Sequence, residues 1–199
     1  MSKDNLYKFS YTIDKDNRNK LNGHNSFVIW LTGLSGAGKS TLANKLDQYL
    51  HLNDIHSYIL NGDNVRKALN GDLGFTEEER DENIRRVSEV AKLFVDAGFI
   101  VITSFISPLQ SHRDLAKELI GEEFFKEVHI NTSFKECEKR DTKGLYKLAN
   151  EGKIKDFTGF DSPFEAPKNP DFIIETENKT VLESSDDLWE YVANLIKYK

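Results

Sequence analysis

Cysteine, proline and long apolar runs are all scarce in this chain of 199 residues, which has one cysteine and four prolines. A single cysteine, Cys137, excludes an intrachain disulfide and a metal site built from several cysteines. No apolar run approaches the ~18 residues of a membrane span, and the amino-terminal stretch lacks the apolar core of a secretion signal. These absences favour a cytoplasmic protein without a membrane partner.

Positive charge is also limited. Lys and Arg number 27 against 33 Asp and Glu, a formal net charge of −6, which argues against a nucleic-acid partner. Four of the few arginines, Arg66, Arg80, Arg85 and Arg86, nevertheless lie close together in the sequence. Arginine suits bidentate contacts with anions, so this cluster indicates a phosphate or sulfate site. For one or two of these residues, a solvated helix face remains the alternative.

The order of apolar segments predicts an α/β fold. Short runs rich in β-forming residues occupy 26–33, 56–63, 99–107, 124–130 and 171–176. Helical patterns pass through Leu42, Leu46 and Leu50 and cover 76–98, 110–120, 133–140, 143–151 and 185–197. Strands that alternate with helices predict a mostly parallel, five-stranded sheet with right-handed crossovers, in three layers α/β/α.

The chain is about one domain long. Residues 1–25 are polar, without a sustained period, and are expected to form an arm or a short helix outside the core. We expect residues 26–199 to form a single domain. Residues 152–170 contain three of the four prolines and are expected to be an irregular loop.

A phosphate-binding loop is the strongest motif. "GLSGAGKS" (33–40) fits the pattern G-x-x-x-x-G-K-[ST] between a predicted strand and a predicted helix. Gly36 and Gly38 allow backbone N–H groups to curl around phosphate oxygens, and the helix amino terminus adds its positive dipole end. Lys39 is placed to reach the β- and γ-phosphates, and Ser40 to ligate Mg²⁺. The motif predicts a nucleoside triphosphate site.

The class of phosphate-loop protein depends on the acids nearby. "NKLD" (44–47) spells a GTPase base-reading motif, but it lies inside the helix that starts at the loop and cannot reach the base. The apolar strand at 99–107 carries no acid. Asp63, at the end of the predicted strand 56–63, is therefore the candidate for steering water-bound Mg²⁺, polarising an acceptor hydroxyl, or both. A helix cap is the alternative role for Asp63.

These features indicate a small-molecule kinase, in which Arg66 and Arg80 could clamp an anionic acceptor. Two alternatives are a kinase for another small acceptor, such as a nucleoside or a sugar acid, and a regulatory nucleotide-binding module without turnover. Retention of Ser40, Asp63 and Arg66 argues against the second.

Beyond these motifs, "NGDNVRKALNGDLGF", "ERDENIRRVSEVAKLFVDAG", "FISP" and "CEKRDTKGLYKLANEGKIKDFTGFDSPFEAP" resemble adenylylsulfate kinase (APS kinase), in the same order across about residues 26–176. The chain is similar to the free-standing form. The resemblance implies a phosphate-loop kinase fold and transfer of the ATP γ-phosphate to the 3′-hydroxyl of adenosine 5′-phosphosulfate (APS), giving PAPS and ADP. It also implies Mg²⁺ and a homodimer.

The resemblance further implies roles for individual residues. The ATP site would comprise Gly33, Leu34, Ser35, Gly36, Ala37, Gly38, Lys39, Ser40 and Thr41, with Arg140, Ala166 and Pro167 over the adenine. The APS site would comprise Asp63, Arg66, Phe75, Arg80, Asn83, Ile106, Ser107, Lys143 and Phe157. Phe75 and Phe157 would sandwich the acceptor adenine. Asp63 and Lys39 would act in catalysis. Ser107 matches the family's phosphoserine position, but it lacks an evident neighbouring base and in-line transfer needs none.

Several positions depart from the family pattern. Asn61 replaces the first Asp of "DGDN", Leu109 and Gln110 follow "ISP" where an aromatic or His and often Arg are usual, and Thr142 replaces Pro. Gln110 puts one anion contact in doubt. We expect residues 152–170 to be a mobile lid that closes over both nucleotides and excludes water.

Overall fold

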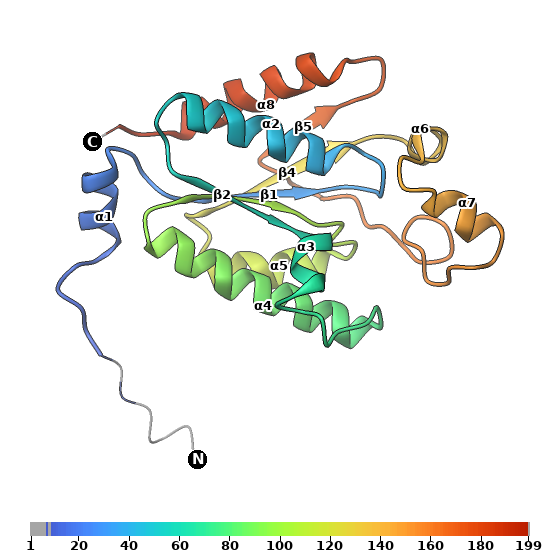
Figure 1. The fold of residues 1–199 in the computed structure, drawn as a ribbon, viewed down its shortest axis with the longest axis horizontal. Helices are drawn as coiled ribbons and strands as arrows, with labels where there is room; N and C mark the ends of the chain where they lie inside the picture. Colours follow the sequence, from blue (N-terminus) through green and yellow to red (C-terminus); the bar gives the residue numbers. More distant parts are fainter. Residues whose placement is uncertain (1–6, 8, 199) are drawn as a thin grey trace.

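The computed structural model describes residue 7 and residues 9–198, so the arm prediction for residues 1–6 and 8 lies outside the described residues. Five strands form one sheet in the order β2-β3-β1-β4-β5 (Figure 1), and every neighbouring pair is parallel. The strands are β1 Val28–Thr32, β2 Ser57–Asn61, β3 Ile100–Ser104, β4 Phe125–Asn131 and β5 Phe172–Glu175. The α/β prediction is confirmed, and the sheet is parallel throughout.

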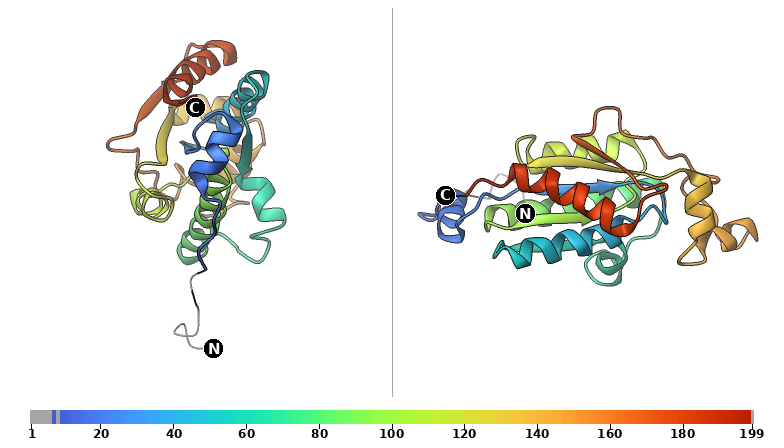
Figure 2. Two further views of the ribbon diagram at one scale, coloured as in Figure 1. Left: turned by 90° about the vertical axis from the view of Figure 1, so that its left-hand side faces the viewer. Right: turned by 90° about the horizontal axis from the view of Figure 1, so that it is seen from above.

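Helices cover both faces of this sheet, as Figures 1 and 2 show. One face carries α2 and α8, and the opposite face carries α4 and α5. The helices are α1 Lys15–Asn22, α2 Lys39–Leu52, α3 Gly62–Lys67, α4 Glu77–Asp96, α5 Gln110–Ile120, α6 Phe134–Arg140, α7 Leu145–Asn150 and α8 Val181–Leu195. Among the described residues, none of these helices is long and apolar enough to cross a membrane.

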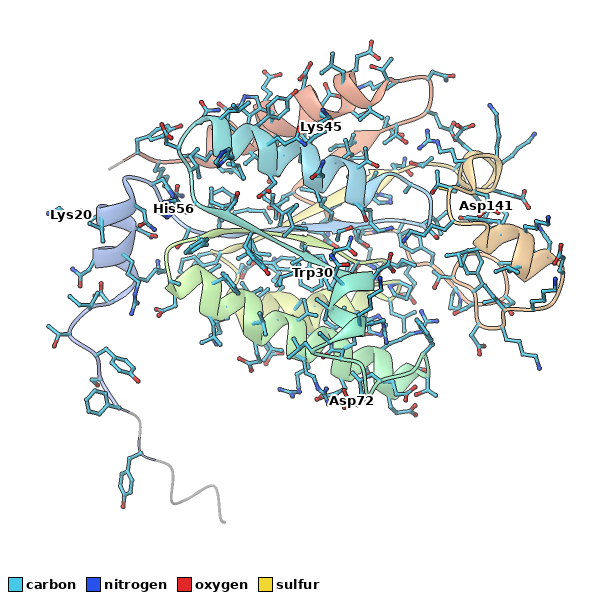
Figure 3. The ribbon with its side chains drawn as sticks, in the orientation of Figure 1. Lys20, Trp30, Lys45, His56, Asp72 and Asp141 are labelled. Atoms are coloured by element: carbon cyan, nitrogen blue, oxygen red, sulfur yellow. The ribbon has the colours of Figure 1, made fainter. Side chains whose placement is uncertain are left out.

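The central strand β1 faces a separate apolar core on each side. Because successive side chains of a strand point to opposite faces, Ile29 and Leu31 pack in the core with Leu46 and Leu188. Val28 and Trp30 pack on the other side, where the second core includes residues of α4 and α5. Figure 3 shows Trp30 deep inside the molecule. Burial on both faces explains the nearly uninterrupted apolar strands.

Three helices start with capping boxes, and in two of them a threonine hydroxyl and a glutamate three residues later satisfy free N–H groups. The box at Thr76 and Glu79 begins α4, at the start of the helix predicted over 76–98. A second box at Thr180 and Glu183 begins α8 at Val181. The prediction of 185 for this start was wrong by four residues, because the box at Thr180 was overlooked.

Part of the predicted arm is attached to the domain. Arg18 of α1 forms an ion pair with Asp96 at the end of α4 (2.9 Å), and Asn22 Nδ2 donates to the Gly98 carbonyl (3.0 Å). Gly98 has φ +90°, a left-handed conformation that favours glycine, and a Cβ there would displace the Asn22 side chain. The predicted short helix therefore exists and packs on α4.

Candidate active site

One large cleft, of about 1120 Å³, lies at the carboxyl ends of the parallel strands. Ligands of open α/β sheets bind at this edge. Its walls come from the phosphate loop, α3, the end of β3, the segment before α7, the predicted lid and the start of α8. The topology thus brings together segments that are far apart in the sequence.

The phosphate loop turns tightly between β1 and α2. Gly33 has φ +147°, and a Cβ there would lie 2.6 Å from the Ile130 carbonyl oxygen, so only glycine fits. Gly38, at φ +108°, caps α2 in a left-handed conformation. Because no side chain caps this helix, its amino-terminal N–H groups stay available for phosphate oxygens.

Lys39 is buried beneath the loop that it serves. Its Nζ donates to the carbonyl oxygens of Gly33 and Leu34, each at 2.8 Å. Burial first, together with the positive charge of Lys143, lowers the pKa of Lys39 from 10.5 to about 8. The hydrogen-bond partners of Lys39 Nζ are neutral carbonyl oxygens. Bound phosphates would add negatively charged partners for this ammonium group.

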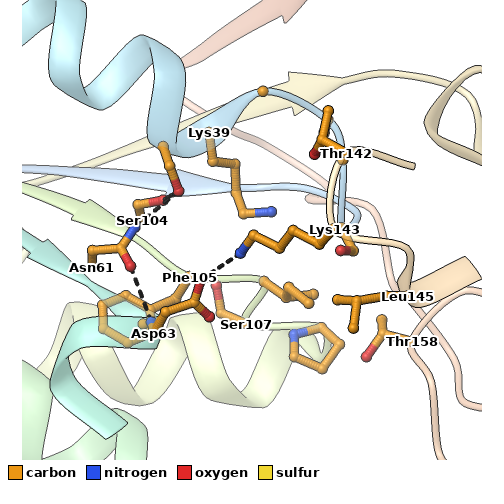
Figure 4. Close-up of a pocket in the computed structure, with 18 of the residues that line it drawn as sticks. Lys39, Asn61, Asp63, Ser104, Phe105, Ser107, Thr142, Lys143, Leu145 and Thr158 are labelled. Atoms are coloured by element: carbon orange, nitrogen blue, oxygen red, sulfur yellow. Dashed lines mark hydrogen bonds and ion pairs between the residues drawn. The ribbon is translucent and has the colours of Figure 1, made fainter. Parts of the chain in front are cut away.

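Ser40 contacts two side chains, Asn61 and Ser104, to which the sequence assigned no role in the site. Its Oγ lies 3.1 Å from Ser104 Oγ and accepts a hydrogen bond from Asn61 Nδ2 (2.8 Å; Figure 4). Asn61 Oδ1 accepts from the Asp63 amide (3.0 Å) and so caps α3. Asn61 and Ser104 end neighbouring strands in matching register, so the sheet-edge argument could have found both.

Asp63 does not end a strand, which corrects the prediction. The strand β2 stops at Asn61, and Asp63 lies in the first turn of α3, because Asn61 starts a helix there. Its carboxylate forms an ion pair with Lys143, from the segment before α7 (Figure 4). Both groups are more than half exposed, at 64% and 53%, so a ligand can reach them.

The donor set fits Mg²⁺ bound together with a nucleotide. Within the described part of the chain, no group of three His, Cys, Asp or Glu side chains could hold a metal. Ser40 and Asp63 instead offer one hydroxyl and one carboxylate oxygen at the same cleft. Mg²⁺ typically binds proteins through one or two such groups, keeping waters and phosphate oxygens.

Arginines and an exposed aromatic ring gather in one part of the cleft. Phe75 is 64% exposed, and the guanidinium groups of Arg66 and Arg80 lie 4.5 and 5.9 Å from its ring centre. Arg66 donates to the Gly74 carbonyl (2.7 Å), whereas Arg80 reaches the lid at Thr158 Oγ1 (3.2 Å). Burial and the nearby Arg80 charge lower the pKa of Arg66. This cationic cluster is suited to an anion.

Ser107 is buried, and its hydroxyl is already engaged. Its Oγ accepts from Trp30 Nε1 (3.1 Å) and donates to Thr32 Oγ1 (3.3 Å), while its backbone has φ +38°. Arg113 holds the Ser107 carbonyl (2.8 Å) and pairs with the buried Glu127 (2.6 Å). This geometry is suited to a structural role for Ser107 in the wall of the cleft.

Comparison with known proteins agrees with this geometry. The model of the family described as adenylylsulphate kinase matches residues 25–175. The chain belongs to the adenylylsulfate kinase family.

Individual members of the family are closely similar. The chain is 52% identical to the probable adenylyl-sulfate kinase of Bacillus subtilis over 87% of each chain. It is 51% identical to the adenylyl-sulfate kinase of Pseudomonas entomophila, over 88% of this chain and 84% of that one. The structure of the Mycobacterium tuberculosis APS kinase CysC in complex with AMPPNP and APS matches with a TM-score of 0.81 and 42% identity, covering 85% of this chain and 98% of that one.

Most site residues predicted from the adenylylsulfate kinase resemblance line the one cleft, but some do not. Gly33, Leu34, Ala166 and Pro167 are not part of its lining. Gly33 and Leu34 contribute carbonyl groups to Lys39, whereas Ala166 is exposed. The predicted residues that line it are Ser35, Gly36, Ala37, Gly38, Lys39, Ser40, Thr41, Asp63, Arg66, Phe75, Arg80, Asn83, Ile106, Ser107, Arg140, Lys143 and Phe157.

The far end of the cleft was partly missed. Beside Arg140 it is lined by Thr176, Lys179, Thr180 and Val181, where β5 leads into α8. Arg140 Nη2 donates to the Thr176 carbonyl (3.1 Å). The capping box at Thr180 marks the start of α8 and so places this segment at the end of a helix next to β5. It was the signal in the sequence from which this wall could have been predicted.

The structure shows where two of the departures from the family pattern lie. Gln110 lies in the first turn of α5, where its Nε2 donates to Asp114 (2.9 Å) and its Oε1 accepts from Arg113 (2.8 Å). It is not part of the cleft lining. Thr142 does line the cleft, next to Lys143.

Proposed function

We propose that this cleft transfers the γ-phosphate of ATP to the 3′-hydroxyl of APS, giving PAPS and ADP. The supporting observation is that a single cleft holds a phosphate loop and, opposite it, a cluster of Arg66, Phe75 and Arg80. The charges of Asp63 and Lys143 both act on Lys39, so these two groups lie at the phosphate end. The proposal agrees with the family to which the chain belongs.

The protein groups act by positioning and charge neutralisation, which dominate phosphoryl transfer. The amino terminus of α2 and Lys39 hold the ATP phosphates. Ser40, and Asp63 through water, would hold Mg²⁺, which when bound neutralises charge on the phosphate oxygens. Asp63 accepts the proton of the acceptor hydroxyl, and the ion pair with Lys143 orients its carboxylate.

The acceptor is held by stacking and by cations. Phe75 and Phe157 bind the two faces of its adenine, and Arg66 and Arg80 bind its phosphosulfate. Asn83 and the strand end at Ile106 complete that wall. Arg140 covers the ATP adenine. Because its hydroxyl is engaged by Trp30 and Thr32, Ser107 shapes the wall and is not phosphorylated during turnover.

A coupled ADP-release assay tests the activity. With Mg-ATP, we expect rapid turnover with APS and only background rates with adenosine monophosphate, gluconate or no acceptor. Rapid turnover with gluconate or adenosine monophosphate, and none with APS, would assign the cleft to another acceptor. Absence of turnover with every acceptor, despite ATP binding, would support a regulatory module.

Asp63→Asn tests the proposed proton acceptor. Removing its basicity is expected to lower kcat by about 10²-fold or more, whereas ATP affinity measured by calorimetry changes little. Asp72→Asn is the matched control, because Asp72 ends a second Asn-Gly-Asp sequence (70–72) and is an exposed acid that pairs with Arg86 (2.7 Å) outside the cleft. Wild-type turnover in Asp63→Asn would remove Asp63 from the mechanism.

Three further expectations stay proposals. Residues 152–170 act as a lid, which Arg80 ties down through Thr158 and the Asp156 carbonyl (3.0 Å). The protein is a homodimer, which sedimentation can measure. Its location is the cytoplasm, which the buried free thiol of Cys137 supports.

A further inference from the structure

Tyr146 of α7 contacts both halves of the cleft from behind. Its side chain is buried, and its hydroxyl donates to the carbonyl oxygen of Ser35 in the phosphate loop (2.8 Å). Its ring meets the ring of Phe157 edge-on, with centres 4.9 Å apart and planes at 87°. One rigid side chain thus joins a loop that holds ATP phosphates to an aromatic group of the acceptor site.

The surroundings allow Tyr146 little independent movement. Phe134 of α6 packs against its ring in a second edge-on contact at 5.3 Å. The Tyr146 amide donates to Asp141 Oδ1 (3.0 Å), which ties the start of α7 to the end of α6. Burial raises the pKa of the Tyr146 hydroxyl, so it stays protonated and remains a donor. Closely packed side chains shift together rather than deform.

The residue after Phe157 connects the lid to the proposed acceptor site. This residue, Thr158, accepts a hydrogen bond from Arg80 (3.2 Å), and Arg80 Nε in turn donates to the Phe75 carbonyl (2.9 Å). A movement of the Ser35 carbonyl would therefore pass through Tyr146 to Phe157 and to the cation cluster. Apart from the peptide bond between Phe157 and Thr158, every link in this path is a hydrogen bond or a ring contact.

We propose that Tyr146 is a positioning residue that couples the two substrate sites, so that a bound nucleotide raises the affinity for the acceptor. The proposal rests on the function proposed above. By linkage, the acceptor must raise the affinity for the nucleotide by the same factor. An ordinary core tyrosine would contribute to folding stability alone and leave this factor unchanged.

Calorimetry with the whole protein tests the proposal. APS is titrated with and without a saturating non-hydrolysable ATP analogue and Mg²⁺, and the ratio of the two dissociation constants gives the coupling factor. For the wild type we expect a factor of about 5- to 150-fold, the usual range of allosteric coupling. Tyr146→Phe keeps the ring and loses the bond to Ser35, so its factor should fall at least about 5-fold, towards 1.

Tyr49→Phe is the matched control. It also loses one tyrosine hydrogen bond, to Asp186 (2.7 Å), at the contact between α2 and α8 outside the cleft. Its coupling factor should equal that of the wild type. An equal loss in both variants, or no loss in Tyr146→Phe, overturns the proposal, as does a wild-type factor of 1.

A double-mutant cycle adds a second readout. If Tyr146 acts through Phe157, then Tyr146→Phe and Phe157→Leu should reduce the coupling factor non-additively, the second change adding little to the first. If the two substitutions reduce the coupling factor independently, so that their effects multiply, Tyr146 does not act through Phe157. Wild-type protein that binds the ATP analogue but never APS would instead refute the proposed function.

Discussion

At the scale of single residues, the local environment decides what each polar group can do. Lys39 is a lysine whose burial lowers its pKa to about 8, so its charge at working pH depends on what binds beside it. Asn61, which replaces an acid of the family pattern, keeps two structural tasks, because its amide caps α3 and also contacts Ser40. Each of these properties follows from contacts within a few ångströms.

Lys39 makes nucleotide binding pH-dependent. Bound phosphates favour the charged ammonium group and so raise its pKa from about 8. Binding of a non-hydrolysable Mg-ATP analogue should therefore take up about half a proton at pH 8 and almost none at pH 6.5, where the free protein is already protonated. Calorimetry in two buffers of different ionisation enthalpy measures this uptake.

Lys45→Met serves as the control for this uptake, because Lys45 lies on the same helix but does not line the cleft. The variant should keep the proton uptake of the wild type, whereas Lys39→Met should lose it. Equal uptake at both pH values in the wild type would contradict the assignment to Lys39.

At the scale of elements, short segments beyond the strand ends build the proposed acceptor site. The connection from α3 to α4 carries Phe75 into the cleft, and the lid supplies Phe157. These two residues differ in burial, because Phe157 packs on Tyr146 whereas Phe75 is 64% exposed. A change at Phe75 therefore tests stacking without disturbing the core.

Phe75→Ala should weaken APS binding and leave folding stability unchanged. Stacking of a base on an aromatic side chain contributes about 1–3 kcal/mol, so the KM for APS should rise about 5- to 150-fold, while the KM for ATP changes little. Leu69→Ala is the control, since Leu69 lies on the same connection, is 48% exposed and does not line the cleft. Steady-state kinetics measure both variants, and an unchanged KM for APS would reject the stacking role.

At the scale of the whole molecule, the cleft lies at one end of the sheet, and the attachment of the amino-terminal segment lies at the other end. The cleft occupies the carboxyl ends of the strands, whereas the segment after α1 is joined to the amino end of β2. There the buried His24 accepts a hydrogen bond through Nε2 from the His56 amide (3.1 Å), and its Nδ1 lies 2.9 Å from the Asn25 carbonyl. This separation predicts that stability and activity can be changed independently.

His24→Ala should destabilise the fold without altering catalysis. It leaves the His56 amide without its partner, which costs about 1–3 kcal/mol, and each kcal/mol lowers Tm by about 2–4 °C at this chain length. Thermal unfolding measures the loss, and the exposed His51→Ala should melt like the wild type. A changed KM for APS at a temperature where the variant is folded would show that the two ends communicate.

The resemblance to the adenylylsulfate kinase family indicated the class of reaction, and the sequence by itself determined the order of the strands and of most helices and the phosphate loop. These follow from local patterns, namely the period of apolar residues, the glycines that a tight turn requires and a capping box such as Thr76 with Glu79. It did not determine that Asn61 and Ser104 meet Ser40, that Lys143 pairs with Asp63, or that Tyr146 contacts Ser35 and Phe157. Only the tertiary structure decided those contacts, because parallel strands and crossover helices join residues that are distant along the chain, and the local pattern around each residue does not depend on its distant partner.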